Sequence, residues 1–152
     1  MNLSVDLGTT ELLSHLTDEE IEFLESVATE FEYAQGDVLF EEDSEATRFH
    51  IIISGKVGLE LVSPRRRPIV IQTLGPGELV GLSWFFPPHT WNWRASALNP
   101  TKTLGFDAAA VRNKCAEDRN LAEQILRLVA REAVARLHAT RTQLLDLYEF
   151  PR

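Results

Sequence analysis

The chain has 152 residues, which is the size of one domain and enough to bury a core without disulfides or a metal ion. Its 15 Lys and Arg residues against 23 Asp and Glu residues give a net charge of −8, opposite in sign to a typical nucleic-acid-binding domain. Hydrophobic residues make up 44% of the chain, so wholesale disorder is excluded. These values indicate a folded acidic domain and disfavour DNA binding.

Signals that direct a protein to a membrane or out of the cell are not visible in the sequence. The first ten residues, MNLSVDLGTT, lack the basic and apolar segments of a signal peptide, and no apolar run approaches the ~20 residues of a membrane span. The one cysteine, Cys115, cannot form an internal disulfide, which fits a reducing compartment. We expect a cytoplasmic protein with no membrane partner.

Residues 1–30 carry helical signals. Thr17, followed by Glu20 three residues later, forms the capping-box pattern that opens a helix, and apolar residues then recur at helical spacing from Ile21 to Ala28. A short helical turn around residues 11–16 is expected before it.

From Phe31 the hydrophobic period becomes two, and Gly and Pro recur about every ten residues. The alternating segments cover residues 31–33, 38–40, 49–53, 57–61, 70–74, 91–98 and 103–106, and a loop is expected over residues 63–68. This pattern predicts six to eight strands in an antiparallel sandwich or roll over residues 31–106. The fold class is therefore α+β, mainly β.

Two helices are expected over residues 107–152. Asp107 caps the first, which runs to about Cys115, and the second runs from about Asn120 to Tyr148. The first half of the long helix has one apolar stripe, made of Leu121, Ile125, Leu128 and Val129. Its second half has a heptad seam offset from that stripe, made of Ala130, Val134, Leu137, Arg141, Leu144 and Tyr148. Either the whole helix packs on its own roll, or the seam packs on a partner chain; the offset favours the second, a homodimer.

The segment from Gly77 to Ala97 departs from the strand pattern. Gly77 and the pair Pro87–Pro88 bound one helical turn, expected over residues 79–85. A helix inserted between strands presents free backbone N–H groups at its start, which suits an anion or a phosphate. The candidate ligand contacts in this segment are Leu79, Val80, Gly81, Leu82 and Ser83.

The order of these elements resembles the cyclic nucleotide-binding domain family. Residues 31–42 (FEYAQGDVLFEE) are similar to its opening strands, residues 49–57 (FHIIISGKV) to its glycine hairpin, and residues 74–81 (LGPGELVG) to the approach to its phosphate-binding cassette. Residues 135–140 (ARLHAT) resemble the long helix of the catabolite activator branch. The resemblance implies one domain over residues 1–152: a jelly roll with N-terminal helices, a short cassette helix and a C-terminal dimer helix.

The ligand contacts of the family match this sequence only in part. Its cassette usually carries a Glu that accepts a hydrogen bond from the ribose 2′-hydroxyl, and here Leu82 takes that position. Its cassette Arg, which pairs with the cyclic phosphate, falls on Trp91 or Asn92. Thr140 matches the helix threonine that contacts the purine. The resemblance therefore implies that cyclic AMP does not bind in the usual way.

Arg94 is the cation nearest to the missing phosphate contact. Alternation places it on the strand face opposite Trp91, Trp93 and Ala95, so it is either a solvated arginine or a displaced ligand arginine. The three tryptophans, Trp84, Trp91 and Trp93, lie within ten residues of each other. They are either filled core or a stacking surface for a flat ring such as a nucleobase.

Catalytic and metal-ligating patterns are missing from the sequence. The four histidines show no metal-ligand spacing, and no nucleophile–base motif occurs. We therefore expect a protein that is not an enzyme, with no metal site and no resident cofactor beyond a bound cyclic nucleotide or dinucleotide.

Two functional hypotheses follow. The first is a stand-alone sensor and dimerisation module, similar to the effector half of a catabolite-activator-like regulator, that binds a nucleotide or related small anion. The regulators of that family continue past the long helix into a helix-turn-helix, whereas this chain ends at Arg152, so no DNA binding is expected. The second is a ligand-free scaffold or accessory subunit that contacts another protein, for example in a redox enzyme complex.

Overall fold

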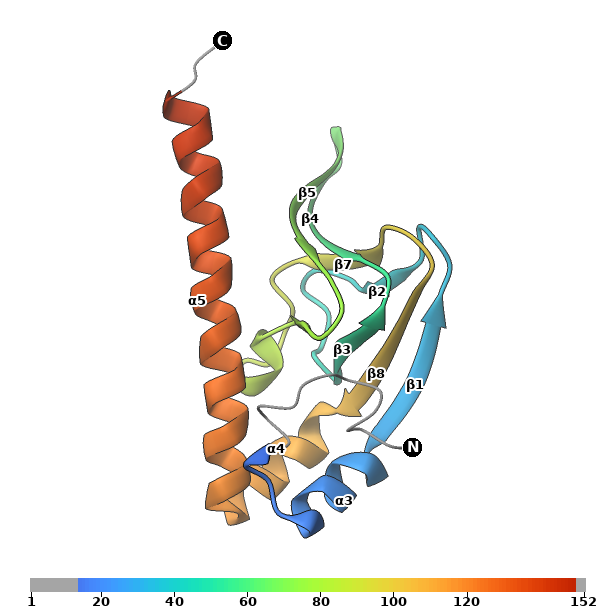
Figure 1. Cartoon of the computed structure of the whole chain (residues 1–152). Helices are drawn as coiled ribbons and strands as arrows, with labels where there is room; N and C mark the ends of the chain where they lie inside the picture. The colour runs from blue at the N-terminus through green and yellow to red at the C-terminus, as the bar shows by residue number, and fades with distance from the viewer. Residues whose placement is uncertain (1–13, 150–152) are drawn as a thin grey trace.

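The computed structural model describes residues 14–149 as a β-roll with helices at one end and along one side (Figure 1). Helix α3 (Asp18–Ser26) begins with the expected capping box: Glu20 N–H donates to Thr17 Oγ1 at 3.2 Å, and Thr17 N–H donates to Glu20 Oε1 at 2.8 Å. The turn expected around residues 11–16 lies mostly outside the described residues.

The described residues form eight strands in two antiparallel sheets, which confirms the mainly β prediction. The strands are β1 (Ala28–Tyr33), β2 (Val38–Phe40), β3 (Arg48–Ser54), β4 (Val57–Ser63), β5 (Arg66–Leu74), β6 (Leu79–Val80), β7 (Arg94–Ala97) and β8 (Thr101–Asp107). One sheet has the order β1–β8–β3–β6, and the other has the order β2–β7–β4–β5. The roll starts earlier than predicted, because Ala28 already pairs with Phe106.

Two further boundaries differ from the prediction. The loop expected over residues 63–68 is a tight turn, since Ser63 pairs with Arg66 and β5 starts there. Pro68 fits this strand because β5 is an edge strand, where a residue without an N–H donor is tolerated. The strand expected over residues 91–98 is limited to β7, and residues 91–93 instead form a loop beside the cavity described below.

The helices close one end of the roll. Helix α4 (Ala108–Glu117) is capped as predicted, with the Ala110 N–H donating to Asp107 Oδ1 at 3.0 Å. Helix α5 (Arg119–Glu149) packs its first half on the core. In this core the rings of Phe49 and Trp84 are stacked, with their centroids 3.9 Å apart. The predicted stripe of α5 is buried there: Leu121, Ile125, Leu128 and Val129.

The second half of α5 runs past the open side of the roll (Figure 1). Along it the apolar residues of the predicted seam are exposed, with Val134 exposed to 64%, Leu137 to 71% and Tyr148 to 81%. The two stripes of the long helix therefore do face different surroundings, as their offset indicated. None of the helices in residues 14–149 is both long and apolar enough to span a membrane.

Candidate ligand-binding site

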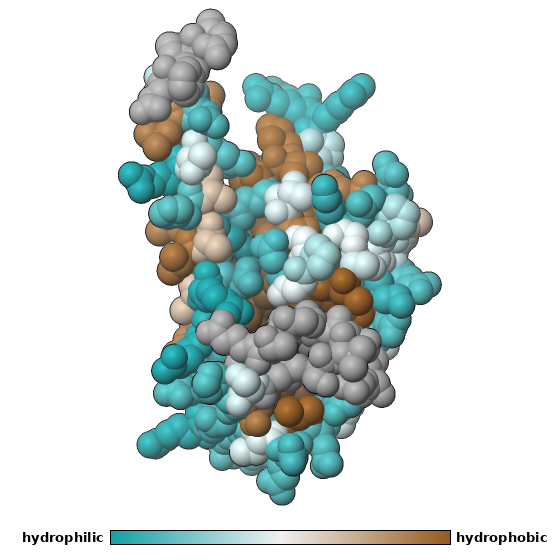
Figure 2. All heavy atoms as spheres, viewed as in Figure 1, coloured by the Kyte–Doolittle hydropathy of each residue, from teal (hydrophilic) through white to brown (hydrophobic). Residues whose placement is uncertain are grey.

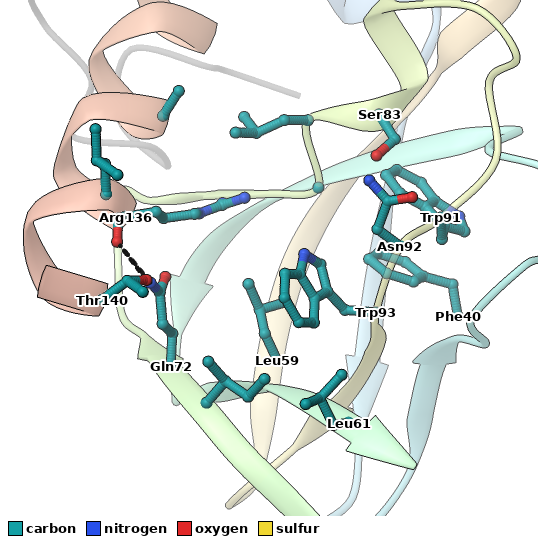
Figure 3. A pocket seen from close by; sticks show the side chains of 15 residues that line it. Phe40, Leu59, Leu61, Gln72, Ser83, Trp91, Asn92, Trp93, Arg136 and Thr140 are labelled. Carbon is teal, nitrogen blue, oxygen red and sulfur yellow. Dashed lines mark hydrogen bonds between the residues drawn. The ribbon is translucent and has the colours of Figure 1, made fainter. Parts of the chain in front are cut away.

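A cavity of about 540 Å³ lies between the roll and the second half of α5 (Figure 3), a volume typical of small-molecule sites. Its walls come from β2, β4 and β5, the turn after β6, the loop before β7, and α5. The lining residues are Phe40, Leu59, Leu61, Ile71, Gln72, Gly81, Leu82, Ser83, Trp91, Asn92, Trp93, Ala133, Arg136, Leu137 and Thr140. Most of this surface is apolar, so the few polar groups decide what the cavity can bind.

The three tryptophans take three different places. Trp84 is fully buried in the core and stacks on Phe49. Trp91 forms a wall of the cavity, stacked on Phe40 at 4.0 Å and only 3% exposed. Trp93 is half-buried, and its ring projects into the middle of the cavity (Figure 3). Trp93 is therefore the ring best placed to stack on a flat ligand.

Side-chain amides join α5 to strand β5 along one edge of the cavity. Gln72 Nε2 donates to the Arg136 carbonyl at 2.9 Å and to Thr140 Oγ1 at 3.1 Å, and Thr140 Oγ1 donates to the same carbonyl at 2.9 Å. One turn further along, Gln143 Nε2 donates to the Ile71 carbonyl at 2.5 Å. These bonds hold the helix over the cavity mouth.

Arg136 is the one charged side chain among the lining residues. Its Nη2 donates to the Leu79 carbonyl, while its enclosed Nε has no hydrogen-bond partner among the described residues. Burial lowers the pKa of Arg136, and the nearby carboxylates of Glu132 and Glu78 oppose that shift. An enclosed donor without a partner costs about 1–3 kcal/mol, so the guanidinium retains unmet hydrogen-bonding capacity.

Glu132 lies on α5 one turn before Arg136 and is 7% exposed. Burial raises the pKa of its carboxyl group, and the Arg136 guanidinium partly offsets this rise. The pair links α5 to the Leu79 end of β6, because Leu79 interacts with both side chains. Glu132 is not among the residues that line the cavity.

A comparison with protein families identifies the domain. A family model described as the cyclic nucleotide-binding domain matches residues 30–118, more than half of the chain. The chain belongs to the cyclic nucleotide-binding domain family. Similar proteins support the same assignment and fold.

A CRP-like cAMP-activated global transcriptional regulator of Mycobacterium tuberculosis is 30% identical over 116 residues, which are 76% of this chain and 50% of that protein. The chain thus spans about half the length of the curated relatives it matches. Among solved structures, a cyclic nucleotide-binding domain from Methylobacillus flagellatus has a TM-score of 0.75 at 17% identity, covering 95% of this chain and 91% of that one. The N-terminal domain of a transcriptional regulator from Streptomyces coelicolor has a TM-score of 0.64 at 30% identity, covering 82% and 89%.

Six of the nine residues that the sequence suggested as ligand contacts line the cavity of this cyclic nucleotide-binding domain. They are Gly81, Leu82, Ser83, Trp91, Asn92 and Thr140. The structure brings these residues together from the turn after β6, the loop before β7 and α5, although they span some sixty positions of sequence. Thr140 stands at the helix position that its match to the family implied.

Leu79 and Val80 do not line the cavity, and the cassette helix expected over residues 79–85 is wrong. Leu79 and Val80 form β6, pair with Ile51 and His50 of β3, and are fully buried. Only Ser83–Phe85 form a single 3-10 turn. The apolar pair adds a strand to the sheet because its burial there outweighs the local helical pattern.

Arg94 also lies away from the cavity. Its Nε donates to Glu60 Oε1 at 2.9 Å, and Ser96 Oγ donates to the same oxygen at 2.6 Å. Arg94 and Ser96 therefore share the strand face opposite the buried Ala95 and Ala97, as the alternation predicted. Of the two interpretations left open, the displaced ligand arginine is not supported by this placement.

Arg136 and Gln72 line the cavity but were not predicted from the sequence. Arg136 could have been found, because it lies four residues before Thr140 and so on the same helix face, one turn away. Nothing in the sequence marked Gln72 as a site residue. A polar residue is expected at many positions of an edge strand in which apolar and polar residues alternate. Trp93 was noted for stacking but not selected as a contact.

Reactive side chains outside the cavity have ordinary structural roles. Cys115 is half-buried, and burial raises the pKa of its thiol to about 11. His50 is buried beside Thr103, with Nδ1 and Oγ1 2.9 Å apart, and burial lowers its pKa to about 3. Within residues 14–149 no group of three or more His, Cys, Asp or Glu residues could hold a metal ion.

Gly81 should tolerate a side chain far less well than Gly36, which has nearly the same φ angle. A Cβ at Gly81 (φ +94°) would lie 2.3 Å from Cζ3 of Trp91, whereas a Cβ at Gly36 (φ +92°) meets nothing within 4 Å. We expect Gly36→Ala to cost about 1–2 kcal/mol from backbone strain alone. Gly81→Ala should cost about 1–3 kcal/mol more, because Trp91 must move. Urea unfolding of both variants measures this, and equal losses would contradict a Trp91 wall packed on Gly81.

Proposed function

We propose that this chain is a cytoplasmic regulatory module that binds a nucleotide or a related small anionic ligand in the cavity between the roll and α5. Arg136 carries the proposal, since it is one positive charge in a cavity whose remaining lining is neutral and largely apolar. Such a cavity favours a ligand that combines an anionic group with a flat apolar ring. Membership of the cyclic nucleotide-binding domain family supports the same ligand class.

Cyclic AMP in the usual pose is a poor fit for this cavity. The ribose acceptor of the family is replaced by Leu82, and the phosphate cation is replaced by Trp91 or Asn92. Each lost charge-assisted hydrogen bond costs about 1.5–3 kcal/mol. Two of them amount to about two to four decades in affinity. The proposed ligand is therefore a different nucleotide, or one bound in a different pose.

A thermal-shift screen over cyclic nucleotides, dinucleotides and nucleoside phosphates tests the proposal. A ligand present at 100 times its Kd adds about 2.7 kcal/mol to the free energy of unfolding, which is readily measured for a domain of this size. We expect at least one phosphate ester to stabilise the protein and to quench tryptophan fluorescence, and Trp93→Leu to abolish both effects.

Trp91→Leu is the matched control for packing. Because Trp91 is a buried wall residue, this variant should lower the free energy of unfolding even when no ligand is present. Micromolar binding of cyclic AMP that Arg94→Ala abolishes would contradict the expected site. No shift with any compound would favour a scaffold that contacts another protein.

The scaffold hypothesis is supported by exposed apolar side chains on the strands of the β4–β5 hairpin below its tip and along α5 (Figure 2). On the hairpin these are Leu61, Val62, Ile69 and Val70, each at least 41% exposed. A protein partner, for example a subunit of a redox enzyme complex, could cover them. Both functions are compatible with a homodimer formed through α5.

We propose that the homodimer forms through the apolar residues of the seam on either side of Arg141, namely Val134, Leu137, Leu144 and Tyr148, each of which is at least 51% exposed. Leu137→Glu should convert the dimer to a monomer, as measured by light scattering at micromolar protein concentration. Leu147→Glu is the matched control: Leu147 is also 71% exposed but lies outside the seam, so this variant should stay dimeric. A monomeric wild type, or a dimeric Leu137→Glu variant, rules the interface out.

A further inference from the structure

The position where the family holds a phosphate cation falls on Trp91 or Asn92 in this protein, and neither side chain is a cation. Trp91 packs its ring against the backbone of Gly81 and stacks on Phe40. The nearest strand cation, Arg94, is paired with Glu60 away from the cavity. An anion in this cavity therefore cannot be held from the roll by a charged side chain of the lining.

Arg136 reaches the same region from the opposite wall. Its side chain extends from α5 into the cavity, on the same side of Trp93 as Ser83 and Asn92 (Figure 3). Its Nη2 donates a hydrogen bond to the carbonyl of Leu79 in β6. This bond holds the guanidinium close to the turn after β6, because Leu79 lies only two residues before Gly81. The guanidinium thus faces neutral polar side chains across the cavity, at a point where no lining carboxylate competes for it.

Two carboxylates lie near the Arg136 guanidinium, and neither of them lines the cavity. Glu132 is buried one turn earlier on α5, and Glu78 directly precedes β6, where its Oε1 accepts a hydrogen bond from the Gly75 N–H at 2.9 Å. A guanidinium has five N–H donors, and the one assigned contact to Leu79 leaves donors for a ligand.

We propose that Arg136 is the anion anchor of this domain and binds the phosphate of a flat-ringed phosphate ester whose ring lies against Trp93. The proposal rests on the proposed function and names the subsite: the anion is held by the long helix instead of by the strand before it. Ser83 and Asn92 supply neutral donors from the opposite wall, and Leu59 and Leu61 lie on the far side of Trp93 (Figure 3).

This placement couples ligand binding directly to α5. The half of α5 that follows Arg136 is joined to the roll by the side-chain amides of Gln72 and Gln143, both close to the cavity mouth. A phosphate bound by Arg136 adds a charged contact between helix and roll at the start of this half. Occupancy of the cavity therefore fixes the helix segment that carries the exposed seam.

The test compares phosphate esters with their dephosphorylated partners: adenosine 5′-monophosphate with adenosine, and guanosine 5′-monophosphate with guanosine. Isothermal titration of the wild-type chain should give tighter binding for at least one monophosphate than for its nucleoside. Arg136→Gln should weaken the affinity for the monophosphate by about ten- to a hundred-fold and leave the affinity for the nucleoside nearly unchanged. The variant should therefore lose the preference for the monophosphate over its nucleoside. The ratio of the two affinities within one variant is insensitive to a general loss of packing.

Arg127→Gln is the matched control, because it removes the same charge from an exposed position of the same helix and should keep the preference. If Arg136→Gln does not fold by circular dichroism, Arg136→Lys keeps the charge and should retain part of the preference. A phosphate preference that persists in Arg136→Gln, or that Arg94→Gln removes instead, overturns the inference and leaves the proposed function standing. If none of the four compounds binds the wild type, the inference fails, and the wider screen of cyclic nucleotides, dinucleotides and nucleoside phosphates decides the proposed function separately.

Discussion

The attachment of the first half of α5 to the roll is the constraint on which the rest of the structure depends. Leu121, Ile125 and Leu128 are buried against the core shared with Phe49 and Trp84. A helix of 31 residues is about 46 Å long, so fixing its first turns in the core carries its second half past the open side of the roll. The cavity lies between that overhanging half and the roll, and the exposed seam runs along the same half, with Leu137 at the edge of the cavity.

The same attachment explains why the polar contacts of the cavity are found on α5. Once the helix axis is set, Arg136 and Thr140 face inward one turn apart, and Gln72 and the Leu79 carbonyl lie within hydrogen-bond distance of them. On the roll side, the two polar positions of the family cassette fall on Leu82 and on Trp91 or Asn92, none of which is charged. The domain thus has the family's fold, and Arg136, the charged side chain among the residues that line its cavity, comes from α5.

Much of the fold could be predicted because it depends on local patterns. The Thr17–Glu20 capping box, the Asp107 cap, the alternating strands and the two stripes of α5 are each encoded within a few residues of sequence. The predictions failed where a distant partner decides the conformation. Leu79 and Val80 have a helical context, yet they pair with β3, about thirty residues earlier in the chain.

The candidate site was predicted in part for the same reason. Residues next to the glycine of the turn, and Thr140 through its match to the family, lie where the sequence suggested. Arg94 forms an ion pair with Glu60, a residue thirty-four positions earlier in the chain. The spacing of residues in the sequence does not indicate that pairing. Gln72 and Arg136 became site residues only because β5 and α5 meet across the cavity.

The claim that ties these points together is that the space under α5 is where this domain binds its ligand. Amide hydrogen exchange of the full chain, with and without saturating adenosine 5′-monophosphate, tests it most directly. We expect slower exchange in residues 81–83, 91–93 and 133–143, with little change on the sheet face around Glu60 and Arg94. Protection confined to that outer face, or bound nucleotide with no protection in α5, would contradict it.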